Sequence, residues 1–155
     1  MQLHFRLEAE LRFSAPFTRE AEAACTELIA EANRVLFFKG VPKGVETGEV
    51  GQIVGAEFAD QVVTLTIESG AYTRAHDALF RFRKQIAPKL GKFRIGIREI
   101  VVRHFSVTMR GRFPENFRVP QLPFIQNASF AGDTFSFDFA VTAADLENRI
   151  PDRFI

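Results

Sequence analysis

The first 13 residues alternate between apolar and polar side chains, and this alternation limits the folds open to the chain. The apolar positions are Leu3, Phe5, Leu7, Ala9, Leu11 and Phe13. A period of two residues is that of a β-strand with one face buried and the other in solvent. The N-terminus therefore predicts a half-buried first strand, which needs a sheet around it and a layer over its apolar face.

Two later segments change to the helical period. In the first, Thr18 is a suitable N-cap, Gly40 a suitable end, and apolar side chains share one face (Ala21, Ala24, Cys25, Leu28, Ile29, Ala32, Val35, Leu36), opposite Glu20, Glu27, Glu31 and Arg34. The second is expected from about Tyr72 to Leu90, with apolar residues every three or four positions (Ala75, Leu79, Phe82, Ile86, Leu90). Pro88 complicates its last turn, and Gly91 marks its end.

The other apolar runs predict β-strands. Residues 50–59 and 61–68 predict a hairpin turned around Asp60, and FIQNASFAGDTFSFDFAV predicts a second hairpin turned at Ala131 to Asp133. Between them, FRIGIREIVVRHFSVTM is one long strand or two strands broken near Gly96. TAADLENR predicts a short helix with Thr142 as its cap.

Five glycines between Gly40 and Gly55 invite comparison with a phosphate-binding loop. Neither G-x-x-x-x-G-K-[ST] nor G-x-G-x-x-G occurs there, so a turn-rich connector is the better interpretation. Together the elements predict an α+β fold: an antiparallel β-sheet of about six strands with two long helices packed on one face. We expect residues 1–155 to form a single domain.

Composition narrows the class of protein. No run is long or apolar enough to span a membrane, and the alternating N-terminus lacks the apolar run of a secretory signal, so we expect a cytoplasmic protein with no membrane partner. Cys25 is the single cysteine and is expected to be a buried structural thiol. Most of the 18 phenylalanines fall at alternating positions and are expected to fill the core.

Catalytic patterns are mostly missing from the sequence. It has no HExxH, no G-x-S-x-G and no zinc-type Cys/His spacing, so no catalytic residue and no metal ligand is predicted. His76 and Asp77 are adjacent, but neighbouring helix positions point about 100° apart and are not expected to pair directly. We expect His76 to be a helix-start residue hydrogen-bonded to a neighbouring loop, and a stand-alone enzyme using this pair is the weakest of three hypotheses.

Positive charge is concentrated in one segment. The whole chain has a formal net charge of +1, but residues 74–98 hold eight Lys and Arg against Asp77 alone, a net charge of +7. Five of the eight are arginines, which suit bidentate phosphate contacts. This distribution favours binding of nucleic acid through its backbone. A protein-interaction module with a basic docking face is the alternative, and an ordinary solvated surface is the third reading.

The same segment resembles a known family. SGAYTRAHDALFRFRKQIAPKLGKFRIGIREI resembles SGRYVRxHDAxxRLRKxLAxxLGKKYxIGIRGI in the N-terminal domain of archaeal, methanogenic-type seryl-tRNA synthetase. QLHFRLEAELRFSAP, EANRVLFFKGVPKG and LENRIPDR agree in the same order. The resemblance implies an antiparallel sheet of about six strands covered by helices, and recognition of serine tRNA chiefly through its long variable arm.

Site residues are carried over position by position. The resemblance places tRNA contacts at Arg81 and Lys84 in FRFRKQ and at Arg98 in IGIRE, with Arg74 and Arg83 as supports. Arg83 has an alternative role as partner of acidic groups on the first helix. Three departures from the pattern bear on the contacts: Ala71 replaces an arginine, Glu99 replaces a glycine beside Arg98, where it orients that side chain or weakens its hold on phosphate, and one residue is missing before Phe93.

The resemblance also implies a longer parent protein. In that family a class II catalytic domain follows, uses ATP, magnesium and zinc to attach serine to tRNA, and carries most of a dimer interface. Those signatures would lie beyond Ile155, so this chain alone is expected to be non-catalytic, without cofactors and monomeric. Two readings remain open: an excised domain of an ATP-dependent ligase, or a free-standing RNA- or protein-interaction domain.

Overall fold

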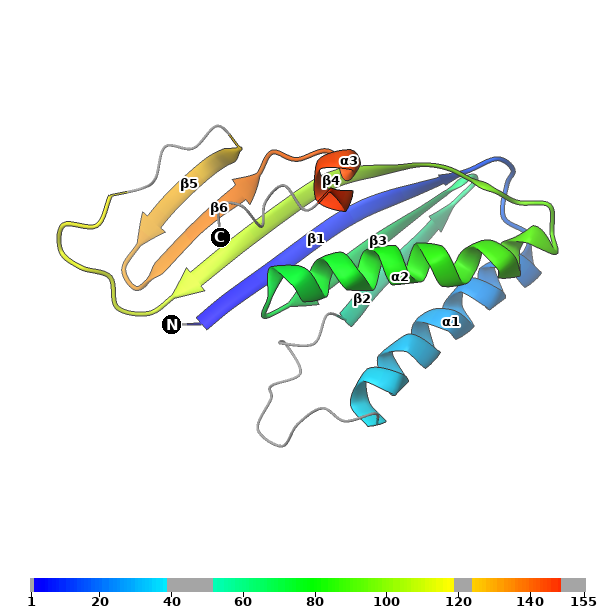
Figure 1. Cartoon of the computed structure of the whole chain (residues 1–155), viewed down its shortest axis with the longest axis horizontal. Coiled ribbons are helices and arrows are strands. Elements are labelled where there is room, and N and C mark those ends of the chain that lie inside the picture. Colours follow the sequence, from blue (N-terminus) through cyan, green and yellow to red (C-terminus); the bar gives the residue numbers. More distant parts are fainter. Residues whose placement is uncertain (1, 39–51, 119–123, 149–155) are drawn as a thin grey trace.

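A computed structural model describes residues 2–38, 52–118 and 124–148. These residues contain one sheet of six strands in the order β2-β3-β1-β4-β6-β5, and every neighbouring pair is antiparallel (Figure 1). The predicted antiparallel sheet with helices is confirmed. The elements are β1 (Gln2–Phe13), α1 (Arg19–Phe38), β2 (Gln52–Ala59), β3 (Val62–Ser69), α2 (Tyr72–Gly91), β4 (Ile97–Arg110), β5 (Ile125–Ala131), β6 (Thr134–Phe139) and α3 (Ala143–Glu147).

The alternation of β1 becomes the two faces of the sheet. Its apolar side chains from Phe5 to Phe13 are buried, whereas Leu3 is exposed. Leu7 lies opposite Ile67 of β3 and Phe105 of β4, so one apolar row crosses three strands. Because the register keeps apolar residues in line, a single face of the sheet carries the core. The opposite face, which carries Arg6, Glu8, Glu10 and Arg12 of β1, is called the outer face below.

Helix α1 begins as predicted. The N–H of Ala21 donates to Oγ1 of Thr18 at 3.1 Å, and Glu20 and Glu22 lie in the first turn, where the helix dipole favours negative charge. Ala21, Cys25 and Leu28 are buried in the same hydrophobic cluster as the sheet. Burial raises the pKa of the Cys25 thiol to about 12. The predicted end at Gly40 and the connector from residue 39 to residue 51 lie outside the described residues.

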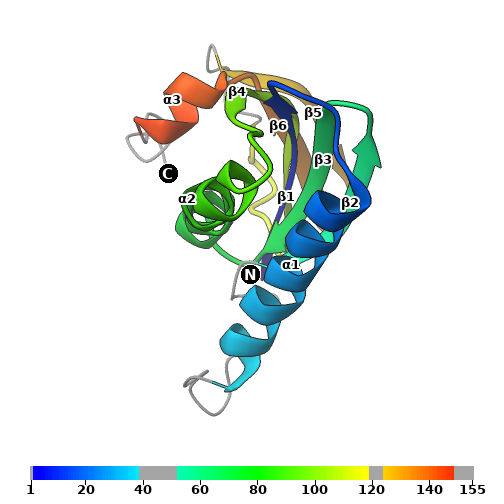
Figure 2. The same cartoon turned by 90° about the vertical axis from the view of Figure 1, so that its right-hand side faces the viewer.

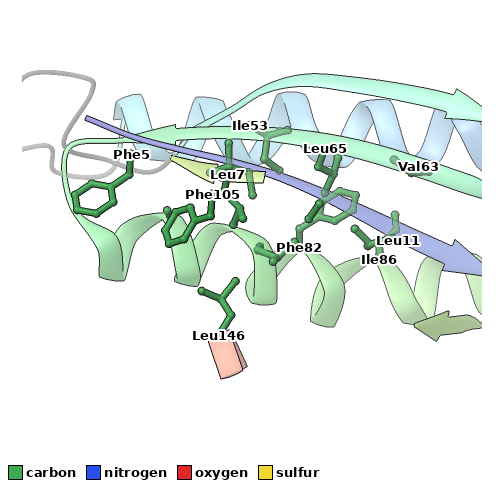
Figure 3. Close-up of a cluster of buried hydrophobic side chains, with 14 of the residues drawn as sticks. Phe5, Leu7, Leu11, Ile53, Val63, Leu65, Phe82, Ile86, Phe105 and Leu146 are labelled. Carbon is green, nitrogen blue, oxygen red and sulfur yellow. The ribbon is translucent and has the colours of Figure 1, made fainter. Parts of the chain in front are cut away.

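Helix α2 runs across the apolar face of the sheet. Its five predicted stripe residues are all buried: Ala75, Leu79, Phe82, Ile86 and Leu90. Figure 3 shows Phe82 and Ile86 pointing toward the sheet, and Leu146 of α3 approaching the same helix. The helix continues through Pro88 and ends at Gly91 as predicted. Pro88 is exposed and lies in the last turn, where its ring cannot donate the backbone hydrogen bond of a helix.

The start of α2 lacks a side-chain cap at Ala71, the position where the family pattern has arginine. Ser69 stabilises the entry instead: its hydroxyl accepts from the N–H of Ala71 at 3.0 Å and donates to the carbonyl of Ala71 at 2.7 Å. The buried Ser69 therefore ties the end of β3 to the beginning of α2.

Strand β4 is one long strand that begins after Gly96, which decides between the two predicted alternatives. Its pairing with β1 contains two register shifts. Arg12 pairs with Glu99 while Phe13 pairs with Ile97, and Glu8 pairs with His104 while Ala9 pairs with Val102. The extra residues are therefore Arg98 and Arg103, each inserted by a β-bulge.

Both hairpins and the last helix agree with the sequence. Asp60, with φ of 55°, turns β2 into β3, and Gly132, with φ of 64°, turns β5 into β6. Phe135, Phe137 and Phe139 are buried on one face of β6. Thr142 and Asp145 form a reciprocal capping box at α3.

The described residues contain three helices, of which α1 and α2 have 20 residues each and α3 has five. Figure 2 shows α2 and α3 on the same side of the sheet, and α1 packs beside α2 and β2. None of the described helices is long and apolar enough to cross a membrane.

Candidate nucleic-acid interface

The exposed side of α2 carries three of the five predicted contact residues in one line. Arg74, Arg81 and Lys84 are separated by seven and three residues, which places them on one helix face. All three are exposed, on the side opposite the buried stripe. We call Arg74, Arg81 and Lys84 the α2 stripe.

The cations of the α2 stripe differ from those of the outer face in their partners. On the outer face, Arg6 contacts Glu68 at 3.0 Å, and Arg103 and Arg12 contact Glu10 at 2.6 and 3.3 Å. The Arg103 hydrogen bond is the main cause of a lowered pKa at Glu10. Among the residues that the structure describes, no ion pair involves any residue of the α2 stripe. Those three charges therefore remain available to an external anion.

Asp77 lies between Arg74 and Arg81 on the helix but pairs with its neighbour. Nδ1 of His76 is 3.2 Å from Oδ1 of Asp77, and the imidazole packs against the Phe80 ring at 4.6 Å between centroids. The prediction that these adjacent residues cannot pair was wrong, because the 100° separation applies to the Cβ directions and not to the ends of the side chains. His76 is buried at 7 % exposure, and its described partner Asp77 lies in the same helix.

Arg83 points away from the α2 stripe. Its guanidinium donates to Oε1 of Glu147 in α3 at 2.6 Å and lies 4.7 Å from the centre of the Phe80 ring. The predicted alternative partner was the first helix, but the carboxylate comes from α3. The hydrogen bond from Arg83 holds the pKa of Glu147 below its ordinary value. Arg83 thus joins α2 to α3 and stands apart from the other predicted contacts.

Arg98 is exposed at the bulge near the start of β4. Glu99 was expected to orient or weaken Arg98, but its carboxylate lies 3.7 Å from the guanidinium of Arg12. The structure therefore separates the predicted residues into three places: the α2 stripe, Arg83 at α3 and Arg98 on β4.

Three more exposed cations lie around the end of α2: Lys89, Lys92 and Arg94. Sequence analysis counted them in the basic segment without assigning them a contact. They continue the positive surface from the helix toward Arg98, since the turn from Lys92 to Gly96 joins α2 to β4. The excess of positive charge in residues 74–98 would have been sufficient to predict these three residues as contacts as well.

A hollow of about 350 Å³ lies elsewhere, and no predicted contact residue lines it. Within it, Asp138 accepts hydrogen bonds from Asn127 at 2.9 Å and lies 2.8 Å from Nε2 of His104. Its lining residues are Val102, Arg103, His104, Gln126, Asn127, Asp138, Phe139, Ala140, Val141 and Thr142. His76 is not among them.

Known proteins that are similar to this chain are tRNA-binding proteins, in agreement with the nucleic-acid surface expected on α2. The family whose model matches residues 3–155 is described as a tRNA-binding domain. The type-2 serine–tRNA ligase of Methanocaldococcus jannaschii is 36 % identical over 162 residues, covering all of this chain and 30 % of the ligase. The type-2 serine–tRNA ligase of Methanococcoides burtonii is 35 % identical over 158 residues, with the same coverage.

A solved structure has the same fold. In the crystal structure of A. aeolicus tRNASec in complex with M. kandleri SerRS, the similar chain superposes with a TM-score of 0.82 at 28 % identity, over 99 % of this chain and 29 % of that one. The chain thus spans less than a third of the length of its relatives. The predicted resemblance to the seryl-tRNA synthetase domain is confirmed, and the chain belongs to the tRNA-binding domain family.

Proposed function

We propose that the α2 stripe binds backbone phosphates of serine tRNA. One observation carries the proposal: these cations are exposed and have no ion pair among the described residues, whereas arginines of the outer face are held by carboxylates. Arginine and lysine aligned along a helix can follow the charged backbone of an RNA strand. The seryl-tRNA synthetase relatives make serine tRNA the natural ligand.

The long variable arm is the part of the tRNA that we propose for this contact. The major groove of an RNA helix is too deep and narrow for side chains to read, so a double-stranded arm is recognised by its shape, its phosphates and its 2′-hydroxyl groups. A helix presenting a line of cations supplies such contacts without reading base sequence. Recognition by shape then selects a tRNA that has a long arm.

Arg98 and Arg83 have different roles in this proposal. Arg98, on the strand that follows the basic turn, contacts a phosphate further along the RNA. Arg83 acts as a support, because its ion pair with Glu147 fixes α3 against α2.

We also propose that α1 and α2 form one helical layer over the apolar face of the sheet, since both contribute to the same buried cluster.

The rest of the parent protein is a further proposal. We propose that this domain serves a class II, ATP-dependent seryl-tRNA synthetase in the cytoplasm, that a separate catalytic part holds ATP, magnesium and zinc, and that this part forms a homodimer. Among the described residues, no group of three or more His, Cys, Asp or Glu side chains could hold a metal ion, so we assign zinc to no described residue. The tRNA-binding domain itself is proposed to be non-catalytic.

A salt titration of tRNA binding tests the contact. Arg81→Ala and Lys84→Ala should each weaken binding of serine tRNA roughly tenfold near 0.1 M salt and reduce the slope of log K against log salt by about one. Gel shift at several salt concentrations measures both quantities. The physical reason is that a variant with one phosphate contact fewer releases fewer counterions from the RNA when it binds.

Arg112→Ala is the matched control. Arg112 is exposed in the segment after β4, so its removal changes the net charge equally without touching α2. It should bind within about twofold of the wild type, because distant exposed charges are screened at this salt concentration. Equal losses for all three variants would show that overall charge, and not the α2 stripe, governs binding.

A further inference from the structure

The turn between α2 and β4 presents an aromatic side chain between two cations. Lys92, Phe93 and Arg94 are three consecutive exposed residues, and Phe93 is 37 % exposed. More than a third of this apolar side chain therefore stays in contact with water, between two charged neighbours. The arrangement is typical of surfaces that bind unpaired nucleic acid bases.

Backbone hydrogen bonds hold this turn in one shape. The carbonyl of Leu90 accepts from the N–H of Phe93 at 3.0 Å and of Ile95 at 3.1 Å. Arg94 has a φ of 59°, a left-handed conformation that is uncommon for a residue other than glycine, and Ile95 is buried directly after it. The Phe93 ring is therefore displayed from a fixed backbone.

The turn is also anchored to the first strand. Gly96 donates from its N–H to Oγ of Ser14 at 2.9 Å and accepts from the N–H of Ser14 at 2.8 Å. These bonds hold the turn beside the end of β1 (Figure 1). A fixed platform loses little conformational entropy when a ligand binds, which favours affinity.

Phe93 differs from the other described phenylalanines. The second exposed one, Phe130 on β5, packs against Phe113 and Phe117 with ring centroids 5.1 and 5.7 Å apart. Among the described residues, Phe93 makes no ring contact with another aromatic side chain. Phe130 is thus part of an aromatic cluster, whereas the exposed part of Phe93 is not covered by another described aromatic ring.

Phe93 lies in the chain between the residues that are proposed to contact RNA. The turn joins the helix that carries Arg81 and Lys84 to the strand that carries Arg98. An RNA that contacts both α2 and Arg98 passes the intervening turn, so its nucleotides come within reach of Phe93. The flanking Lys92 and Arg94 favour a polyanion over an uncharged partner.

We propose that Phe93 is a stacking platform for an unpaired nucleobase of the bound RNA, with Lys92 and Arg94 contacting the adjoining phosphates. The inference rests on the proposed function and adds a base contact to a surface otherwise built for phosphates. Stacking accepts any base, so the platform adds affinity and fixes the position of the RNA without reading its sequence.

Fluorescence tests the stacking directly. The chain has no tryptophan and one tyrosine, so Phe93→Trp supplies a single tryptophan, which can be excited selectively, at the proposed platform. Serine tRNA should quench this fluorescence on binding, because a stacked base is an efficient quencher. In the control Phe130→Trp, the fluorophore lies on the edge strand β5, and tRNA should leave it unchanged. Absence of quenching in Phe93→Trp under conditions where the gel shift shows full binding would overturn the platform.

Affinity provides a second test that separates stacking from charge. Phe93→Leu keeps an apolar side chain of similar bulk but removes the ring, and should weaken tRNA binding roughly five- to 100-fold, the range of a lost base–aromatic stack. The slope of log K against log salt should stay unchanged, since no phosphate contact is lost. Phe93→Tyr should bind as the wild type does.

Inorganic polyphosphate is the control ligand, because it has the charge of an RNA backbone but no bases that could stack on Phe93. Phe93→Leu and the wild type should bind it equally, whereas Arg81→Ala should bind it more weakly. Weaker polyphosphate binding by Phe93→Leu would show that the ring supports the turn and does not stack on a base. If Arg81→Ala loses tRNA affinity while Phe93→Leu does not, the platform fails and the proposed function stands; if neither variant changes tRNA binding, the proposed function fails as well.

Discussion

At the scale of single residues, the partner of a cation decides its role. Arg83, Lys84 and Arg98 belong to the same basic segment, but of these three only Arg83 has a carboxylate partner among the described residues, Glu147. This partner is 64 residues away in the chain, so composition and periodicity could not reveal the pair. The sequence could identify the basic segment, whereas the division between structural and available cations depends on tertiary contacts.

Arg83→Met should raise the pKa of Glu147 toward its ordinary value. The hydrogen bond and charge of Arg83 favour the ionised carboxylate and lower that pKa in the folded state. A lowered folded-state pKa stabilises the fold above the unfolded-state pKa, and the gain disappears as the pH falls through the folded-state pKa. The stability difference between wild type and variant should therefore be present at neutral pH and shrink in acid.

NMR titration of the Glu147 side chain measures the shift, and denaturation at several pH values measures the stability difference. Arg112→Met is the control, because Arg112 forms no ion pair among the described residues. An unchanged Glu147 titration in Arg83→Met would contradict the proposed connection between α2 and α3.

The thiol of Cys25 should react only when the protein opens. Cys25 is fully buried, and its pKa is raised to about 12, so almost no thiolate is accessible near neutral pH. It is the single cysteine, which makes labelling by a thiol reagent unambiguous. The labelling rate should follow the unfolding equilibrium as urea is added; rapid labelling of the native protein would show that α1 is not packed as described.

At the scale of elements, the period of the apolar residues was sufficient to predict where β1 and α2 begin and end. It was not sufficient to predict the register in which β1 pairs with β4. The alternation in β1 and the stripe in α2 predicted both elements to within about two residues. The bulges at Arg98 and Arg103 were not predicted, because a register shift depends on how β1 and β4 fit together. The pair of His76 and Asp77 was missed for a similar reason, since its geometry depends on side-chain rotamers.

Leu79→Ala should destabilise the fold by about 2–5 kcal/mol, because it leaves a cavity between α2 and the sheet. Leu79 is fully buried in the middle of the α2 apolar stripe. Urea denaturation followed by circular dichroism gives the free energy of unfolding. Gln85→Ala, on the exposed side of the same helix, should change that free energy by less than about 0.5 kcal/mol. Similar values for the two variants would contradict the assigned buried face of α2.

At the scale of the whole molecule, the two faces of the sheet have different uses. One face is covered by the apolar core, while on the outer face Arg6 and Arg103 lie against glutamates. The cations of the α2 stripe and of the following turn have no such partner among the described residues. The strand and helix pattern could predict this architecture, because each element shows one apolar face. The ion pairs that join β1 to its neighbours, such as those of Arg6 with Glu68 and of Arg103 with Glu10, could not be predicted, since they depend on how the strands pair.

The isolated domain should be monomeric. Among the described residues, the large exposed apolar side chains are Leu3, Val54, Phe93 and Phe130, which come from four separate segments. Stable dimers generally bury a continuous apolar core at their interface. Sedimentation equilibrium should give the monomer mass of 17.5 kDa across a wide dilution series. Association that grows with concentration, without preference for long-armed tRNA, would favour a protein-docking role.

The central claim is that the α2 stripe contacts the long variable arm of serine tRNA, and a double-mutant cycle tests it most directly. Binding is measured for wild type and Arg81→Ala, each with intact serine tRNA and with the same tRNA whose variable arm is shortened. The two changes should be non-additive, because removing either partner of one contact makes removal of the other nearly silent. Arg81→Ala should therefore weaken binding of the intact tRNA roughly tenfold and of the shortened tRNA hardly at all. An equal loss with both tRNAs would contradict the account.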